Sequence, residues 1–288
     1  MIYIMTIAES IHQARLALQA VGIADAPREA EVLLAACLGL SRAQLIAHPE
    51  RLLTPREQQR LHCWLRRRAN REPLAYITRR AWFYGLELIV GRGVLIPRPE
   101  TEVLVELFLE WATRSRHEAY PILVDAGTGS GAIALACLRH APLWRSVGID
   151  RSRSALHIAQ INRRKQRMET RLLLVQSDWL TALRPQSVDA LLSNPPYVLP
   201  EEWETLQPEI RWYEPRRALL VPADEPLQPY RQLAKAARCV LRSPGLIALE
   251  TSPRLAPDVV ECLAEHGFAH PRVRADYSGV ARVVWATV

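Results

Sequence analysis

The sequence places an amide side chain and two prolines directly after an apolar run, in the order Ser193-Asn194-Pro195-Pro196-Tyr197. The run from Val188 to Leu192 is mostly aliphatic and predicts a buried strand. The prolines end that strand, remove two backbone N–H donors and fix φ, so the chain is rigid there. Because open α/β sheets bind ligands beyond the carboxyl ends of their strands, this segment is a candidate site.

Such a strand end offers hydrogen-bond acceptors to a flat NH2 group. The side-chain oxygen of Asn194 and the carbonyl of Pro195 would each accept one hydrogen bond, and Tyr197 would stack on the π face. The competing interpretation is a proline-rich surface turn. The position after a buried strand, downstream of a glycine-rich turn, favours a site. We therefore expect catalysis by Asn194, Pro195 and Tyr197, and substrate binding by these three together with Pro196.

The glycine-rich turn is Asp125-Ala126-Gly127-Thr128-Gly129-Ser130-Gly131. It lies between a predicted strand, Ile122 to Asp125, and a predicted helix, Ala132 to Arg139. Alternate glycines let the backbone turn sharply and approach a ligand closely. The spacing differs from the G-x-G-x-x-G of dinucleotide sites, and Asp125 suits an ammonium group better than a phosphate.

Two later strand ends add groups that suit a nucleoside. Asp150 follows the turn by about twenty residues, where a carboxylate can hold both hydroxyls of a ribose. Asp178 and Trp179 end the next strand, with an acid near the base and an indole against its face. An amino-acid group, a ribose and an adenine in this order describe S-adenosylmethionine. The predicted cofactor contacts are Asp125, Gly127, Thr128, Gly129, Ser130, Gly131, Asp150, Asp178, Trp179 and Asn194. The alternative for each acid is a helix N-cap, a role that Asp178 suits best.

The length and composition of the chain allow two domains and exclude several classes of protein. The chain has 288 residues, of which 49% are hydrophobic and 23% charged, as in globular proteins with a sizeable core. The formal charge of +7 is mostly arginine and favours an acidic or phosphate-bearing partner without identifying one. Five cysteines without a CxxC pair favour a reducing cytoplasm and buried thiols. We expect no membrane segment, signal peptide or metal site.

The first part of the chain has helical spacing, from Thr6 to about Asn70. Thr6 with Glu9 predicts a capping box, and Asp25, Ser41 and Thr54 predict three further helix starts. We expect a small bundle. The expected inward residues include Leu16 and Val32, and Arg68 is expected to point outward.

From Leu74 to Val90 an alternating, aromatic-rich pattern predicts a β-hairpin with Gly85 at the turn, joining domains 1–77 and 78–288. Strands and helices then alternate, which predicts a parallel sheet wrapped by helices. The last two strands, Ala269 to Asp276 and Val280 to Ala286, leave no room for a helix and should be antiparallel. The expected fold is a Rossmann-like, seven-stranded sheet that follows a helical bundle.

Together these residues resemble the bacterial release factor glutamine methyltransferases. The resemblance also rests on the segment Leu95-Ile96-Pro97-Arg98-Pro99-Glu100-Thr101-Glu102 and on the leading helices. It implies that the sheet is of the class I methyltransferase type. It also implies transfer of the methyl group of S-adenosylmethionine to the side-chain amide nitrogen, N5, of a glutamine. That glutamine lies in the Gly-Gly-Gln loop of peptide chain release factors, which the helical domain would help to recognise. The chain departs from the family pattern after Arg216, after Glu250 and after Gly279.

Two alternatives stay open. An N6-adenine DNA methyltransferase would present a similar planar NH2 group, and the basic charge fits it. Against it, no target-recognition domain follows the catalytic core, so DNA is not the expected substrate. The second alternative is a paralogue that binds release factors without turnover, supported only by the three altered segments. We expect a cytoplasmic monomer.

Overall fold

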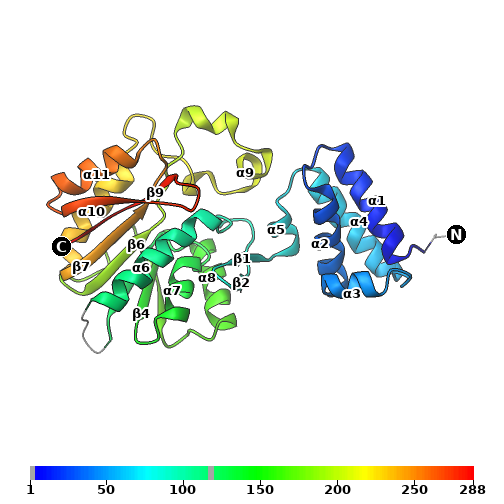
Figure 1. The fold of residues 1–288 in the computed structure, drawn as a ribbon, viewed down its shortest axis with the longest axis horizontal. Helices are drawn as coiled ribbons and strands as arrows, with labels where there is room; N and C mark the ends of the chain where they lie inside the picture. Colours follow the sequence, from blue (N-terminus) through cyan, green and yellow to red (C-terminus); the bar gives the residue numbers. More distant parts are fainter. Residues whose placement is uncertain (1–3, 116–119) are drawn as a thin grey trace. The chain divides into compact units, whose positions relative to one another are not determined.

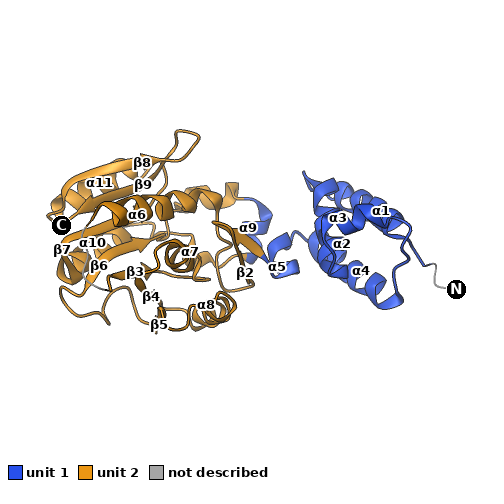
Figure 2. Cartoon of the chain, turned by 60° about the horizontal axis from the view of Figure 1, so that its bottom comes forward, with its two compact units in different colours: residues 1–80, 207–213 blue, residues 81–206, 214–288 orange. Residues whose placement is uncertain are grey.

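The computed structural model describes residues 4–115 and 120–288, which form two compact units (Figure 2). The first unit contains Met1–Arg80 and Gln207–Tyr213, and the second contains Ala81–Leu206 and Glu214–Val288. The segment Gln207–Tyr213 therefore belongs to the helical unit, although the sequence places it within the second half of the chain.

The first unit is helical, as predicted. Its helices are α1 (Ile7–Ala20), α2 (Ala26–Leu38), α3 (Arg42–Ala47), α4 (Pro55–Ala69), α5 (Leu74–Thr78) and α9 (Pro208–Tyr213). The expected capping box begins α1, where the Thr6 hydroxyl accepts from the Glu9 N–H and the Glu9 carboxylate accepts from the Thr6 N–H. The same reciprocal arrangement begins α3 at Ser41 and α4 at Thr54. Each box satisfies N–H groups that the first helical turn leaves unpaired.

The inward stripes of α1 and α2 are built from smaller residues than expected. Leu16 and Val32 are exposed, so their assignment to the core was wrong. In α1 the buried positions after Ile7 are Ser10, Ala14 and Leu18, which recur at helical spacing. In α2 the buried positions are Ala26, Ala30, Leu33, Leu34 and Cys37. Both small and large residues lie on these stripes, and Ala14, Leu18, Ala26, Ala30 and Leu33 share one core cluster.

Arg68 was expected to point outward, and this prediction was wrong. Its side chain is only 6% exposed, between Glu29 of α2 and Glu209 of α9. Its Nη1 donates to Glu209 at 3.0 Å, and its Nε and Nη2 donate to Glu29. A buried guanidinium needs charged partners to offset lost hydration. Glu209 lies 141 residues away in sequence, so spacing along α4 alone could not show this partner.

Replacing Arg68 with alanine should destabilise the first unit by about 3 kcal/mol, because Glu29 loses the guanidinium that bonds both its oxygens, while Glu209 keeps its ion pair with Arg71. Chemical denaturation of the full chain, followed by circular dichroism, measures this. Arg66 lies on the same helix and is exposed, so its alanine variant should stay within about 0.5 kcal/mol of the wild type. Equal stability of the two variants would contradict the role given to Arg68.

The second unit contains the predicted seven-stranded sheet (Figure 1). Its strands are β3 (Ile122–Ala126), β4 (Arg145–Asp150), β5 (Leu172–Gln176), β6 (Val188–Ser193), β7 (Leu241–Glu250), β8 (Ala269–Ala275) and β9 (Ala281–Thr287). The order is β5-β4-β3-β6-β7-β9-β8. The first five strands in this order are parallel, and β9 pairs antiparallel with both β7 and β8. The chain order reverses beside β3, between β4 and β6, which is where open α/β sheets bind their ligands.

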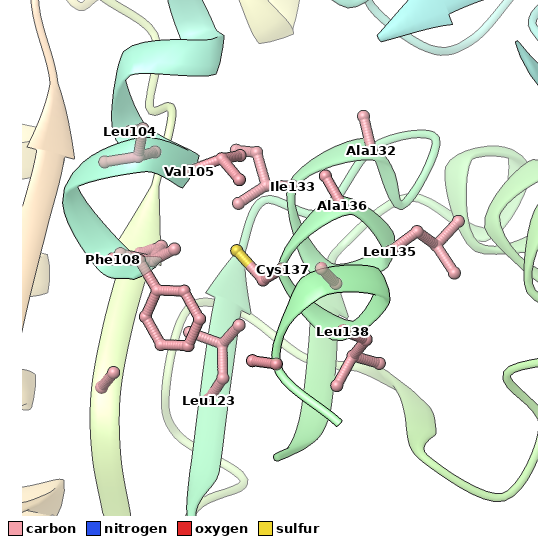
Figure 3. Packing of buried hydrophobic residues seen from close by; sticks show 14 of the residues in the cluster. Leu104, Val105, Phe108, Leu123, Ala132, Ile133, Leu135, Ala136, Cys137 and Leu138 are labelled. Atoms are coloured by element: carbon pink, nitrogen blue, oxygen red, sulfur yellow. The ribbon is translucent and has the colours of Figure 1, made fainter. Parts of the chain in front are cut away.

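Helices cover both faces of this sheet. They are α6 (Glu102–Arg114), α7 (Ala132–His140), α8 (Arg153–Lys165), α10 (Gln228–Val240) and α11 (Ala256–Glu265), with short 3₁₀ turns at Pro99–Thr101, Pro200–Thr205 and Arg216–Ala218. Side chains of α6 and α7 pack with Leu123 on one face (Figure 3). Side chains of α10 and α11 pack with Val124 on the other face. Side chains of adjacent strand residues therefore point into the hydrophobic cores on opposite faces of the sheet. This is why the central strands are almost continuously apolar.

The segment Leu74 to Val90 is only partly a hairpin. Leu74–Thr78 forms α5, and the hairpin is limited to β1 (Ala81–Phe83) and β2 (Leu86–Leu88). Tyr84 and Gly85 both have positive φ, of 46° and 73°, as tight hairpins require at their two central residues. The expected turn at Gly85 is confirmed, and the start of the expected first strand was wrong because five residues after Pro73 close a helical turn instead.

The five cysteines are all free, and they are not all buried as expected. Cys37, Cys137 and Cys262 are buried, whereas Cys63 and Cys239 are exposed. Each exposed thiol lies on the outer face of an amphipathic helix, α4 or α10. Within residues 4–115 and 120–288, no helix has both the length and the apolar character needed to cross a bilayer.

Candidate active site

A cavity of about 540 Å³ in the second unit lies at the carboxyl ends of β5, β4, β3 and β6. Its wall contains Trp179, Asp150, Gly129 and Asn194, one from the end of each of these strands in that order. The strand order therefore places the groups expected to hold a base, a ribose, an amino acid and a planar amide next to one another. Pro195 and Pro196 complete the substrate end of the wall.

The glycine turn is held open toward this cavity. Gly127, Gly129 and Gly131 have φ of 76°, 55° and 83°, which side chains other than glycine adopt at a cost. A Cβ at Gly127 would meet no atom within 4 Å, so its missing side chain leaves room for a ligand. The N–H of Gly129 donates to the Asp150 carboxylate at 3.0 Å. This hydrogen bond ties the turn to the end of β4.

Asp125 lies under the turn and does not line the cavity. Its Oδ2 accepts from the Thr128 hydroxyl at 2.6 Å and from the Ala134 N–H at 3.1 Å. Its Oδ1 has no hydrogen-bond partner among the described residues. Complete burial raises the pKa of this carboxyl to about 6. In this structure Asp125 fixes the turn to α7, and its direct contact with an ammonium group stays a prediction.

Hydrogen bonds fix the polar groups at the end of the cavity that is expected to hold the base and the ribose. Asp150 accepts from the Ser152 N–H at 2.8 Å as well as from Gly129, and each carboxylate oxygen keeps a lone pair for a further donor. The Trp179 indole donates to Gln232 Oε1 at 2.6 Å, which fixes the ring. Asp178 is exposed at the cavity wall. These side chains are held before any ligand binds.

Asn194 is half-buried, and a hydrogen bond orients its side chain. Its Nδ2 donates to the Thr101 hydroxyl oxygen at 3.1 Å. With the nitrogen engaged in this way, Oδ1 is the end of the amide that can accept from a ligand. This is the acceptor that the sequence predicted, and Thr101 is a partner that the sequence analysis did not assign.

Tyr197 does not line the cavity, contrary to the expected stacking on substrate. Its hydroxyl donates to Glu250 Oε1 at 3.2 Å, and its ring packs against the core under α10 and α11. Burial, together with the charge of Glu250, raises the pKa of Tyr197. A buried phenol needs a hydrogen-bond partner, and Glu250 at the end of β7 supplies one on the side away from the cavity.

Further polar groups around the cavity were not predicted from the sequence. Glu214 is buried and accepts from the Ile96 N–H at 3.0 Å and from the Arg98 guanidinium. Arg217 donates to Ser152 Oγ, and both residues line the cavity. The sequence signal for Arg98 was its place between two prolines in the segment Leu95 to Glu102, and Glu214 and Arg217 flank Pro215 and Arg216. Their partners lie too far along the chain to be found from spacing.

Comparison with known proteins identifies the family. Residues 9–78 match the PrmC N-terminal domain, and residues 101–207 match the methyltransferase small domain. The release factor glutamine methyltransferase of Caulobacter vibrioides is 36% identical over 97% of this chain and 96% of its own length. The chain belongs to the release factor glutamine methyltransferase family.

Two further comparisons agree with this result. The release factor glutamine methyltransferase of Chlorobaculum tepidum is 38% identical over 90% of this chain and 89% of its own. The crystal structure of a methyltransferase from Pyrococcus furiosus superposes with a TM-score of 0.50 at 13% identity, covering 70% of this chain and 89% of that one. At this identity the superposition supports the class I methyltransferase fold alone.

The cofactor of a release factor glutamine methyltransferase is S-adenosylmethionine, and the residues present fit it. The cavity volume lies within the range of small-molecule sites. The open space at Gly127 would take the methionine part, the fixed carboxylate of Asp150 the ribose, and the Trp179 indole the adenine.

Proposed function

We propose that this chain methylates the side-chain amide nitrogen of the glutamine in the Gly-Gly-Gln loop of a peptide chain release factor. One observation carries the proposal beyond the family. Asn194, with its amide nitrogen engaged by Thr101, shares one cavity wall with the glycine turn. This arrangement supports a single site in which Asn194 would accept from a planar NH2 group beside a cofactor held at the glycine turn.

The residues at the end of β6 would act by orientation and electrostatics. An amide nitrogen is a weak nucleophile because its lone pair is delocalised into the carbonyl. S-adenosylmethionine supplies an electrophilic methyl group when it is bound. Asn194 Oδ1 and the Pro195 carbonyl would accept the two N–H groups of the glutamine, fix the nitrogen and stabilise the positive charge that develops on it. Holding the nitrogen at a fixed position supplies the remaining advantage through proximity.

The partner and location follow from this activity. We infer that residues 1–77 recognise the release factor and that residues 78–288 carry out the transfer. The chain would act in the cytoplasm, since its substrate is a component of translation, and we infer that it does so as a monomer. The acidic or phosphate-bearing partner suggested by the charge of +7 would then be the release factor itself.

Incubation with methyl-labelled S-adenosylmethionine tests the proposal. Label should enter an intact release factor and should not enter a release factor whose Gly-Gly-Gln glutamine is replaced by alanine. Duplex DNA serves as the second substrate. Label in DNA and none in the release factor would overturn the proposal in favour of an adenine methyltransferase. Binding of cofactor and release factor without any transfer would show a paralogue that lacks turnover.

A further inference from the structure

We propose that Thr101 and Glu250 are positioning residues that decide which end of the Asn194 amide faces the cavity. The inference rests on the proposed function. Neither residue needs to touch the substrate, because both act through Asn194. Thr101 comes from the turn before α6 and Glu250 from the end of β7, so two distant segments converge behind the end of β6.

The need for such positioning follows from the chemistry of an asparagine side chain. Its oxygen and nitrogen ends have nearly the same shape, but only the oxygen can accept from a substrate NH2 group. The Thr101 hydroxyl lies 3.1 Å from Asn194 Nδ2 and is almost fully buried. A hydroxyl can either accept from the amide nitrogen or donate to the amide oxygen. The direction of the Thr101 proton therefore fixes the direction of the Asn194 amide.

Glu250 supplies the group that fixes this proton. Its carboxylate is fully buried, and its Oε1 accepts from Tyr197 while Oε2 has no hydrogen-bond partner among the described residues. The Thr101 hydroxyl faces this carboxylate and stabilises its charged form. An ionised carboxylate can only accept hydrogen bonds. Thr101 must then donate toward Glu250, and its oxygen is left to accept from Asn194 Nδ2.

The charge of Glu250 is sensitive to pH. Burial raises the pKa of Glu250 to about 7, and the nearby Glu100 also raises it, while the Thr101 and Tyr197 hydroxyls and Arg282 lower it. Arg98 faces Tyr197, and Tyr230 of α10 donates to the backbone carbonyl of Glu250. Above this pKa the carboxylate is ionised and can only accept, so it favours the Thr101 proton pointing toward it. Below it one oxygen becomes a donor, and the Thr101 proton can turn to Asn194 Oδ1.

A pair of Thr101 variants tests the inference in the full chain. Thr101→Ser keeps the hydroxyl, and Thr101→Val keeps the shape without it. Thr101→Val should lower kcat for release factor methylation by roughly 10–10²-fold, because a misplaced reacting group costs up to about this much. The kcat of Thr101→Ser should stay within roughly threefold of the wild-type kcat, because the hydroxyl that positions Asn194 is kept. Both should bind S-adenosylhomocysteine as the wild type does.

Thr251→Val is the matched control. Thr251 is also buried and is the neighbour of Glu250, but its hydroxyl donates to the Ser252 carbonyl at 3.4 Å and contacts Tyr230, not Asn194. The same substitution there should leave kcat unchanged. Equal kcat values for Thr101→Val and Thr101→Ser would overturn the inference, whereas an inactive wild type would instead overturn the proposed function.

The pH profile provides a readout that a purely structural role would not change. The kcat of the wild type should fall as the pH drops through about 7. Glu250→Gln always carries a donor on one end, so it should show low kcat without this acidic limb between about pH 6 and 8. An unchanged acidic limb in Glu250→Gln would contradict the assignment of that limb to Glu250.

Discussion

Replacing Asn194 with alanine is expected to lower kcat for release factor methylation by about 10²–10³-fold, the usual effect of removing one preorganised hydrogen-bonding group. The variant loses the acceptor that orients the glutamine NH2 group and stabilises the charge developing on nitrogen. The glycine turn, Asp150 and Trp179 keep their own hydrogen bonds. Binding of S-adenosylmethionine should therefore weaken far less than turnover.

Single-turnover kinetics and calorimetry on the same preparation separate these effects. Glu265→Ala is a suitable control, because Glu265 is an exposed residue at the end of α11 in the second unit and does not line the cavity. That variant should retain wild-type transfer. Full activity of Asn194→Ala, or a loss explained entirely by weaker cofactor binding, would contradict the role given to Asn194.

Replacing Asp150 with alanine is expected to raise the Kd for S-adenosylmethionine on the order of 10²-fold. Hydrogen bonds to a charged group contribute about 1.5–3 kcal/mol each, and the variant would lose those to the ribose hydroxyls. The same carboxylate accepts from the backbone N–H groups of Gly129 and Ser152. The substitution also removes the hydrogen bond that fixes the glycine turn, which weakens the binding of S-adenosylmethionine further.

Isothermal titration of the full chain with S-adenosylmethionine measures this effect. Asp258→Ala is the control, because Asp258 is an exposed acid in the first turn of α11. Its Kd should equal that of the wild type. A wild-type Kd for Asp150→Ala would show that the ribose binds elsewhere.

Local patterns in the sequence predicted most of the second unit. The alternation of apolar runs and amphipathic stretches predicted the parallel sheet and its last antiparallel pair, and the ends of β8 and β9 lie within one residue of the expected ones. The glycine turn and the proline-stiffened end of β6 are also local signals. They could be found because the residue types that form them, glycine and proline, restrict the backbone directly.

The strand order and the long-range polar contacts could not be predicted in this way. The adjacency of β4, β3 and β6 depends on which apolar faces pack together, and many orders satisfy the same pattern. Tyr197 turns to Glu250, and Arg68 turns to Glu209, because a buried polar group takes a partner from wherever the fold provides one. Thr101 was missed as the partner of Asn194 for the same reason, since 93 residues separate them.

The most direct test of the account is a crystal structure of the chain with S-adenosylhomocysteine and a peptide containing Gly-Gly-Gln. The account predicts the glutamine NH2 group within hydrogen-bond distance of both Asn194 Oδ1 and the Pro195 carbonyl, with the sulfur of the cofactor product beside the glycine turn. A glutamine side chain bound outside this cavity, or facing the nitrogen end of Asn194, would contradict it.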